Sequence, residues 1–191
     1  MTGDIRGADD IIRLIQSDAW RMEALAFVSA LELPDCWIGA GFVRNAVWDA
    51  LHGRETLTEL DDIDVLYFDP GDIGRDREQE FEAVLIDTAP GFPWSVRNQA
   101  RMHLRNGDAP YLSTVDAMRH WLETATGVAV RLNGAGGLDL VAAHGIDDLV
   151  DLVLRPTPQG FRRRDQYEAR LRKKNWPAIW PRLTILDRPP V

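Results

Sequence analysis

The residues of this chain with the clearest chemical potential are two aspartates separated by one position, Asp62 and Asp64. In a strand, residues two apart project from the same face, about 7 Å from each other. Two neighbouring carboxylates repel, and Mg²⁺ or Mn²⁺ takes oxygen ligands from one or two carboxylates together with phosphates and water. The pair therefore predicts a metal site of the kind used in phosphoryl transfer. The alternative is a solvated acidic start of a strand.

A turn of small residues precedes this pair by about twenty positions. It consists of Gly39, Ala40 and Gly41, with Arg44 just beyond it. A helix that begins here presents unpaired backbone N–H groups and a partial positive charge, and small residues let a phosphate approach those donors. Arg44 would add a charge-assisted hydrogen bond. The alternative is a turn whose small residues serve packing alone.

Both segments resemble a known signature. Residues 41–45 read Gly-Phe-Val-Arg-Asn and resemble the Gly-x-Val-Arg-Asp segment of the head domain of CCA-adding enzymes and poly(A) polymerases, in the DNA polymerase beta superfamily. Residues 62–65 resemble that group's Asp-Ile-Asp-hydrophobic strand. Residues 94–103, with 155–158, resemble a family of small bacterial nucleotidyltransferase-like proteins, over about residues 10–185.

The resemblance implies an α+β nucleotidyltransferase fold, in which a small mixed sheet has helices packed on one face. It implies that a nucleoside triphosphate binds at Gly39, Ala40, Gly41 and Arg44. Asp62 and Asp64 would be the catalytic metal ligands for Mg²⁺ or Mn²⁺. An acceptor hydroxyl, of unknown identity, would attack the α-phosphate and pyrophosphate would leave.

Three positions depart from the head-domain pattern. Ala40 stands where the pattern has glycine, and Asn45 stands where it has aspartate. A third carboxylate of the superfamily would fall at or near Ser95. The altered turn at Ala40 and the missing acid at Ser95 favour the alternative of a non-catalytic nucleotide-sensing or protein-binding module, comparable to an antitoxin subunit.

Three further residues are candidates for the same site. Asp139 is an acid within the apolar run 138–142 and is a second candidate for the third carboxylate, or else a solvent-facing hairpin residue. Arg97 and Arg101 would share a face if the strand continues that far. They would then clamp a phosphate, or pair with the acidic residues.

Composition and charge restrict the class of protein. The chain has 191 residues, a hydrophobic fraction of 45% and one cysteine, which favours a globular protein of the reducing cytoplasm and excludes an internal disulfide. No stretch is apolar enough to span a membrane. Residues 155–191 hold ten Lys or Arg against three Asp or Glu, whereas the other residues hold 12 against 27. The acidic body argues against a large nucleic acid as partner, and the basic tail either touches a polyanion or packs against that body.

The expected elements place both motifs. We predict a nucleotidyltransferase-like domain over 1–155 and a basic extension over 156–191 packed on the same domain. Expected helices are 9–32 with a break capped by Asp18, 42–51, 75–87, 113–123, 146–154 and 162–174; expected strands are 36–38, 63–68, 92–98, and a hairpin of 128–132 and 138–142.

Overall fold

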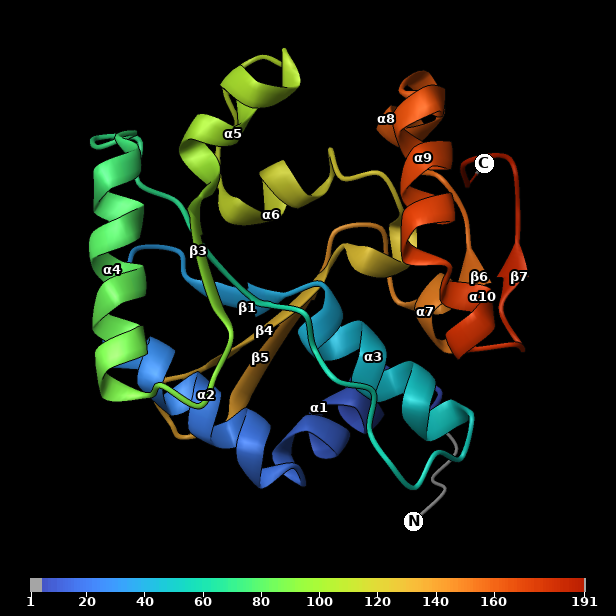
Figure 1. Cartoon of the computed structure of the whole chain (residues 1–191), viewed down its shortest axis with the longest axis horizontal. Helices are drawn as coiled ribbons and strands as arrows, with labels where there is room; N and C mark the ends of the chain where they lie inside the picture. Colours follow the sequence, from blue (N-terminus) through green and yellow to red (C-terminus); the bar gives the residue numbers. More distant parts are fainter. Residues whose placement is uncertain (1–4, 191) are drawn as a thin grey trace.

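A five-stranded mixed sheet forms the centre of the molecule (Figure 1), in a computed structural model that describes residues 5–190. The strands are β1 (Trp37–Gly39), β2 (Ile63–Tyr67), β3 (Trp94–Asn98), β4 (Val128–Leu132) and β5 (Leu138–Ala142). Their order is β3-β2-β1-β4-β5, with β2 and β3 parallel and the other pairs antiparallel. The predicted α+β class is confirmed.

The helices surround this sheet, and a short parallel pair of strands lies beside it. The helices are α1 (Ala8–Gln16), α2 (Ala19–Ser29), α3 (Gly41–Leu51), α4 (Arg75–Thr88), α5 (Gln99–Asn106), α6 (Thr114–Met118), α7 (Asp147–Val150), α8 (Pro158–Arg162), α9 (Arg164–Lys174) and α10 (Trp176–Ile179), with a 3-10 turn η1 (Thr124–Thr126). The pair consists of β6 (Val153–Leu154) and β7 (Thr184–Ile185). No helix within residues 5–190 is both long and apolar enough to cross a bilayer.

Strand β2 separates the main core from the face that carries the aspartates. Ile63 and Val65 are fully buried in the large hydrophobic cluster that the sheet shares with α1, α2 and α3. Leu66 packs instead in a small cluster on the opposite face, with Trp37 and Met118. Because side chains alternate along a strand, residue 64 shares the face of Leu66. The predicted orientation of β2 is therefore correct.

The basic tail packs against α3 through aromatic rings. The ring centroids of Trp176 and Trp180 lie 6.2 and 5.1 Å from that of Trp48. Trp180 Nε1 also donates a hydrogen bond of 2.8 Å to Oδ1 of the fully buried Asp49. These contacts fix the position of α10, and with it the end of α9, relative to the sheet.

Two predicted helices are wrong in extent. The predicted helix over 113–123 ends at Met118. The predicted helix over 146–154 covers only Asp147–Val150, because Leu152 has a φ of +57° that no α-helix accommodates, and the chain then enters β6.

Helix α5 is an element that the apolar pattern did not predict. Asn98 ends β3 and caps α5 by accepting a hydrogen bond from the N–H of Ala100, and Gly107 ends the helix with a φ of +69°. Arg101 therefore lies in a helix, and the expectation that it shares a strand face with Arg97 is wrong.

Candidate active site

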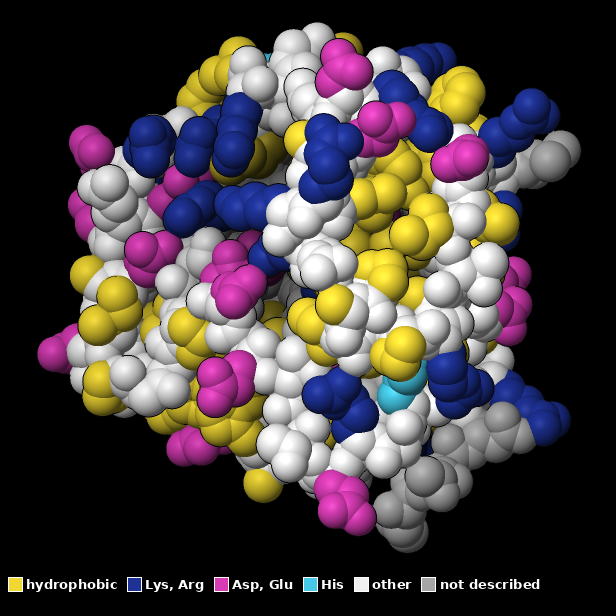
Figure 2. Space-filling model, turned by 45° about the vertical axis from the view of Figure 1, so that its right-hand side comes forward, with side chains coloured by type: hydrophobic (Ala, Val, Ile, Leu, Met, Phe, Trp, Pro, Cys, Tyr) yellow, Lys and Arg dark blue, Asp and Glu magenta, His cyan; other side chains and the backbone are white. Residues whose placement is uncertain are grey.

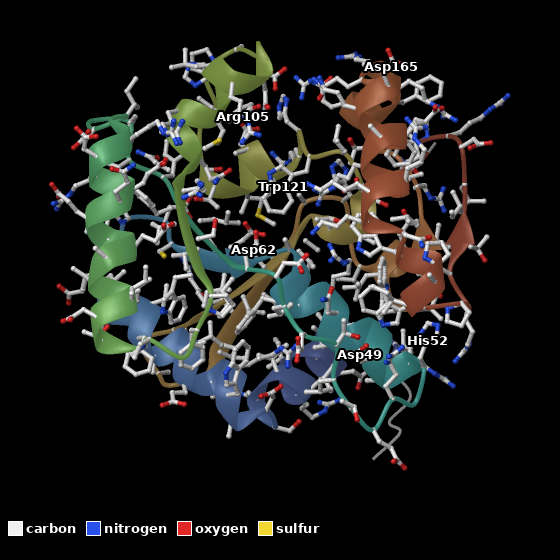
Figure 3. The ribbon with its side chains drawn as sticks, viewed as in Figure 1. Asp49, His52, Asp62, Arg105, Trp121 and Asp165 are labelled. Atoms are coloured by element: carbon white, nitrogen blue, oxygen red, sulfur yellow. The ribbon has the colours of Figure 1, made fainter. Side chains whose placement is uncertain are left out.

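Asp62 and Asp64 lie at one cleft of about 700 Å³ on the face of the sheet opposite the main core. Figure 3 shows Asp62 near the middle of the molecule, with Trp121 above it and Arg105 on α5 beyond. Figure 1 shows β3 and α5 on one side of this region and α9 on the other. The cleft is lined by residues of β2, β3, α5, the α6–η1 segment and α9, including Ala40, Ser95, Arg97, Glu123, Thr126, Arg163, Arg170 and Lys174.

Strand register places the two sequence motifs side by side. Asp64 is directly opposite Gly39 on β1 and beside Ser95 on β3. A Cβ on Gly39 would lie 2.9 Å from Leu66 Cδ1 and 3.2 Å from the carbonyl oxygen of Val128. Glycine is therefore required here for strand packing. At the neighbouring position where the superfamily pattern places a third acid, this chain carries the hydroxyl of Ser95.

The two aspartates have no protein partner. Within residues 5–190, neither Asp62 nor Asp64 forms an ion pair or a side-chain hydrogen bond. Burial, and then the charge of Asp62, raises the pKa of Asp64 to about 6, against the opposing charge of Arg170. An uncompensated pair of carboxylates at a cleft is the arrangement that a hard divalent cation stabilises.

These residues fit Mg²⁺ or Mn²⁺ held by few protein ligands. The described residues contain no group of three or more His, Cys, Asp or Glu side chains that would enclose a metal ion by themselves. Mg²⁺ is commonly held by one or two carboxylates, with substrate phosphates and water completing an octahedron. Asp62 and Asp64 match that open arrangement.

Arg44 lies behind the cleft and does not line it. Its guanidinium lies over the rings of Trp48 and Trp176, at 5.3 and 4.8 Å from their centroids. It donates hydrogen bonds to Asn45 Oδ1 at 2.8 Å and to Thr126 Oγ1 at 3.3 Å, and burial lowers its pKa to about 10. These contacts join α3, η1 and α10, so Arg44 supports the walls of the cleft from behind.

Ala40 is the residue of the turn that reaches the cleft. Its backbone has a φ of +53° and a ψ of −121°, a conformation that suits glycine. Its N–H donates to the carbonyl of Val128, which joins the turn to β4. The two flanking glycines, Gly39 and Gly41, do not line the cleft. The turn is therefore strained at the one position where the head-domain pattern has glycine and this chain has alanine.

Of the other candidates, Ser95 and Arg97 lie at the cleft, whereas Arg101 and Asp139 do not. Arg97 Nη1 is 3.1 Å from Glu82 Oε2. Arg101 points away from the cleft, with its Nε 2.6 Å from Glu78 Oε1.

Asp139 lies on β5, at the far edge of the sheet, 3.0 Å from Arg131 Nη2, and lines a separate cavity of about 280 Å³. The prediction that Asp139 lies near the aspartate pair is therefore incorrect, because strands β1 and β4 lie between β2 and β5 in the sheet.

The basic side chains in and next to α9 and in α5 were not among the residues that the sequence predicted for the site. Arg163, Arg170, Lys174 and Arg105 all line the cleft, as does the buried Glu123. The sequence shows the excess of positive charge in the tail, but it left open whether that charge contacts a polyanion or packs against the acidic body. The structure shows that part of this charge packs against the acidic body and lines the cleft at the same time.

The comparisons with known proteins agree with this geometry. A family model described as "Nucleotidyltransferase" matches residues 26–185. The chain belongs to this nucleotidyltransferase family. A search of curated proteins finds no match.

Solved structures show the same fold. An NMR structure described as revealing a CCA-adding enzyme head domain is 30% identical, with a TM-score of 0.87, over 98% of this chain and 100% of the other. A CCA-adding enzyme in apo form II has a TM-score of 0.54 at 17% identity, over 92% of this chain and 44% of that one. A CCA-adding enzyme in complex with CTP has a TM-score of 0.50 at 18% identity, over 81% and 38%. The chain thus spans less than half of the two CCA-adding enzyme chains and all of the head-domain chain, and the expected nucleotidyltransferase fold is confirmed.

Proposed function

We propose that this protein is a metal-dependent nucleotidyltransferase that transfers a nucleoside monophosphate from a nucleoside triphosphate to an acceptor hydroxyl. The observation that carries the proposal is the aspartate pair: Asp62 and Asp64 have no ion-pair partner among residues 5–190 and share one cleft with basic side chains, in a chain of the nucleotidyltransferase family. The fold is shared with a CCA-adding enzyme bound to CTP, which supports a nucleoside triphosphate as the donor.

The chain's own residues supply position and charge. Asp62 and Asp64 would hold Mg²⁺ or Mn²⁺, which would offset the negative charge that develops in phosphoryl transfer. In the reaction, the acceptor oxygen forms a bond to the α-phosphorus, the bond from the α-phosphorus to pyrophosphate breaks, and the hydroxyl proton passes to solvent water. Ser95 and Arg97 lie beside the pair and can hydrogen-bond phosphate oxygens. Catalysis of this type rests on alignment and electrostatics.

Release of pyrophosphate tests the proposal. The purified protein is mixed with Mg²⁺ or Mn²⁺, each of the four nucleoside triphosphates, and acceptors that carry hydroxyl groups of different classes. We expect metal-dependent pyrophosphate release that is lost in the Asp62→Asn/Asp64→Asn double variant and kept in Asp139→Asn, an acid of the same sheet outside the cleft. Equal release by the double variant and the wild-type protein would contradict the assignment.

One observation favours a second function, nucleotide binding without transfer. Ser95 stands beside Asp64 where a third acid is expected, and the described residues form no three-acid cluster. A protein that binds metal and nucleotide through Asp62 and Asp64 but releases no pyrophosphate with any acceptor would be a nucleotide-sensing or protein-binding module. The binding and release measurements together separate the two functions.

A further inference from the structure

Helix α9 presents a row of polar and basic side chains to the cleft. Gln166, Arg170 and Lys174 of α9 line it at intervals of four residues, and Arg163, immediately before the helix, lines it as well. Residues three and four apart lie on the same face of a helix, with Cβ atoms about 5–6 Å apart. The row therefore forms a continuous wall, and Figure 2 shows Lys and Arg side chains gathered at a hollow in the surface.

Each basic side chain of this wall is held by its own carboxylate. Arg163 pairs with Asp108, Arg170 Nε lies 2.9 Å from Glu123 Oε1, and Lys174 Nζ lies 2.8 Å from Asp61 Oδ2. Arg163 and Lys174 line the cleft, whereas their partners Asp108 and Asp61 do not.

Glu123 is 1% exposed, and its carboxylate forms an ion pair with Arg170. Ion pairs of this kind limit the rotamers of long side chains before a ligand arrives.

The wall faces the aspartate pair without touching it. No described basic residue forms an ion pair with Asp62 or Asp64, although Arg170 is the strongest opposing charge on Asp64. Charges of opposite sign are thus held apart across an open cleft. This arrangement is complementary to a ligand whose anionic groups face the basic wall and whose bound cation faces the aspartate pair.

We propose that the cleft-facing side of α9, and Arg170 and Lys174 in particular, binds the phosphate chain of the nucleotide. The identity of the anion rests on the proposed function, whereas the anion-binding wall is tested without turnover. This assignment gives the basic tail a direct part in ligand binding, although the phosphate site expected from the sequence was the turn that contains Ala40. Arg44 lies behind the cleft and Gly39 is required for strand packing, so Ala40 is the residue of the turn that lines the cleft together with α9.

Two neighbouring lysines provide a matched test. Lys174 lines the cleft, whereas Lys173 is exposed on another face of the same helix and lines no described cleft. Lys174→Gln and Lys173→Gln remove the same charge from adjacent positions, so long-range effects on the net charge are equal. Neither substitution removes a buried partner, because Asp61 is 82% exposed. Circular dichroism and thermal unfolding will verify that both variants fold.

The measurement is the binding of inorganic tripolyphosphate by calorimetry, in a buffer that contains Mg²⁺. We expect Lys174→Gln to weaken binding about tenfold, the effect of losing one charged hydrogen bond, and Lys173→Gln to weaken it less than twofold. Equal effects of the two substitutions, no effect of either, or no binding by the wild-type protein would each overturn the proposal. If the expected difference is found but no nucleoside triphosphate releases pyrophosphate, the phosphate site stands and the transferase function fails.

Discussion

Replacement of Asp64 by asparagine should make the metal-free protein more stable while removing its proposed metal ligand. The side chain is largely buried on β2 beside Asp62, and burial and this neighbour raise its pKa from 3.8 to about 6. When folding raises the pKa of an acid, ionisation of that acid lowers the free energy of unfolding of the native state. Asparagine has nearly the same shape without that charge, so the variant avoids the cost.

The magnitude follows from the shift. A pKa raised from 3.8 to about 6 corresponds to about 3 kcal/mol of unfolding free energy, at about 1.4 kcal/mol per unit. Because the native state retains the proton more strongly than the unfolded state, wild-type stability falls as the pH rises from about 4 to 6 and the full cost applies above pH 6. For a chain of this size, each kcal/mol shifts the melting temperature by about 2–4 °C.

The assay is thermal and urea unfolding in EDTA at several pH values between 4 and 8. We expect Asp64→Asn to exceed the wild-type protein in stability by up to about 3 kcal/mol at pH 8 and to match it near pH 4. Asp139→Asn is the control, because hydrogen bonding to Asn133 and the charge of Arg131 lower the pKa of Asp139, and its loss should not stabilise the protein. A variant no more stable than the wild-type protein at pH 8, or equally more stable at both pH values, would refute the reasoning.

Three further predictions concern the framework of the site. Ala40→Gly should stabilise the protein by about 1 kcal/mol, since relief of a strained backbone exceeds the entropy cost of glycine; lower stability in urea unfolding would argue against strain at φ +53°. Asp49→Ala should destabilise the protein by about 3 kcal/mol, because the Trp180 indole N–H and the N–H and hydroxyl of Thr58 lose their acceptor; a loss below about 1 kcal/mol, with unchanged tryptophan fluorescence, would show that the Asp49 contacts do not hold the tail. Burial raises the pKa of the Cys36 thiol to about 12, so a thiolate-specific reagent at pH 8 should react far more slowly with the folded protein than in urea, and equal rates would contradict this burial.

Local signals in the sequence predicted most of the elements that hold the site. Asp18 caps α2 as expected, by accepting a hydrogen bond from the N–H of Arg21. The alternation of Ile63 and Val65 with polar residues gave the orientation of β2. Helix α5 was missed because its sequence is polar and lacks a clear apolar stripe; its ends are set by Asn98 and by Gly107.

The walls of the cleft depended on packing between distant segments. The Asp-x-Asp spacing predicted that Asp62 and Asp64 lie on one face, because residues two apart in a strand point to the same side of the sheet. The position of α9 depends on the burial of Trp180 against Trp48, more than a hundred residues earlier in the chain. The sequence predicts that the tail packs on the domain, but no local pattern identifies Trp48 as the partner of Trp180, so the contribution of Lys174 to the cleft could not be predicted.

The central claim is that Asp62 and Asp64 together hold a divalent metal with a nucleotide in the cleft. Mn²⁺ binding, followed by electron paramagnetic resonance with and without a non-hydrolysable nucleoside triphosphate, measures this directly. The account predicts that the wild-type protein binds Mn²⁺ more tightly when the nucleotide is present, and that Asp62→Asn/Asp64→Asn loses this binding while Asp139→Asn retains it. Undiminished, nucleotide-enhanced Mn²⁺ binding by the double variant would contradict the account.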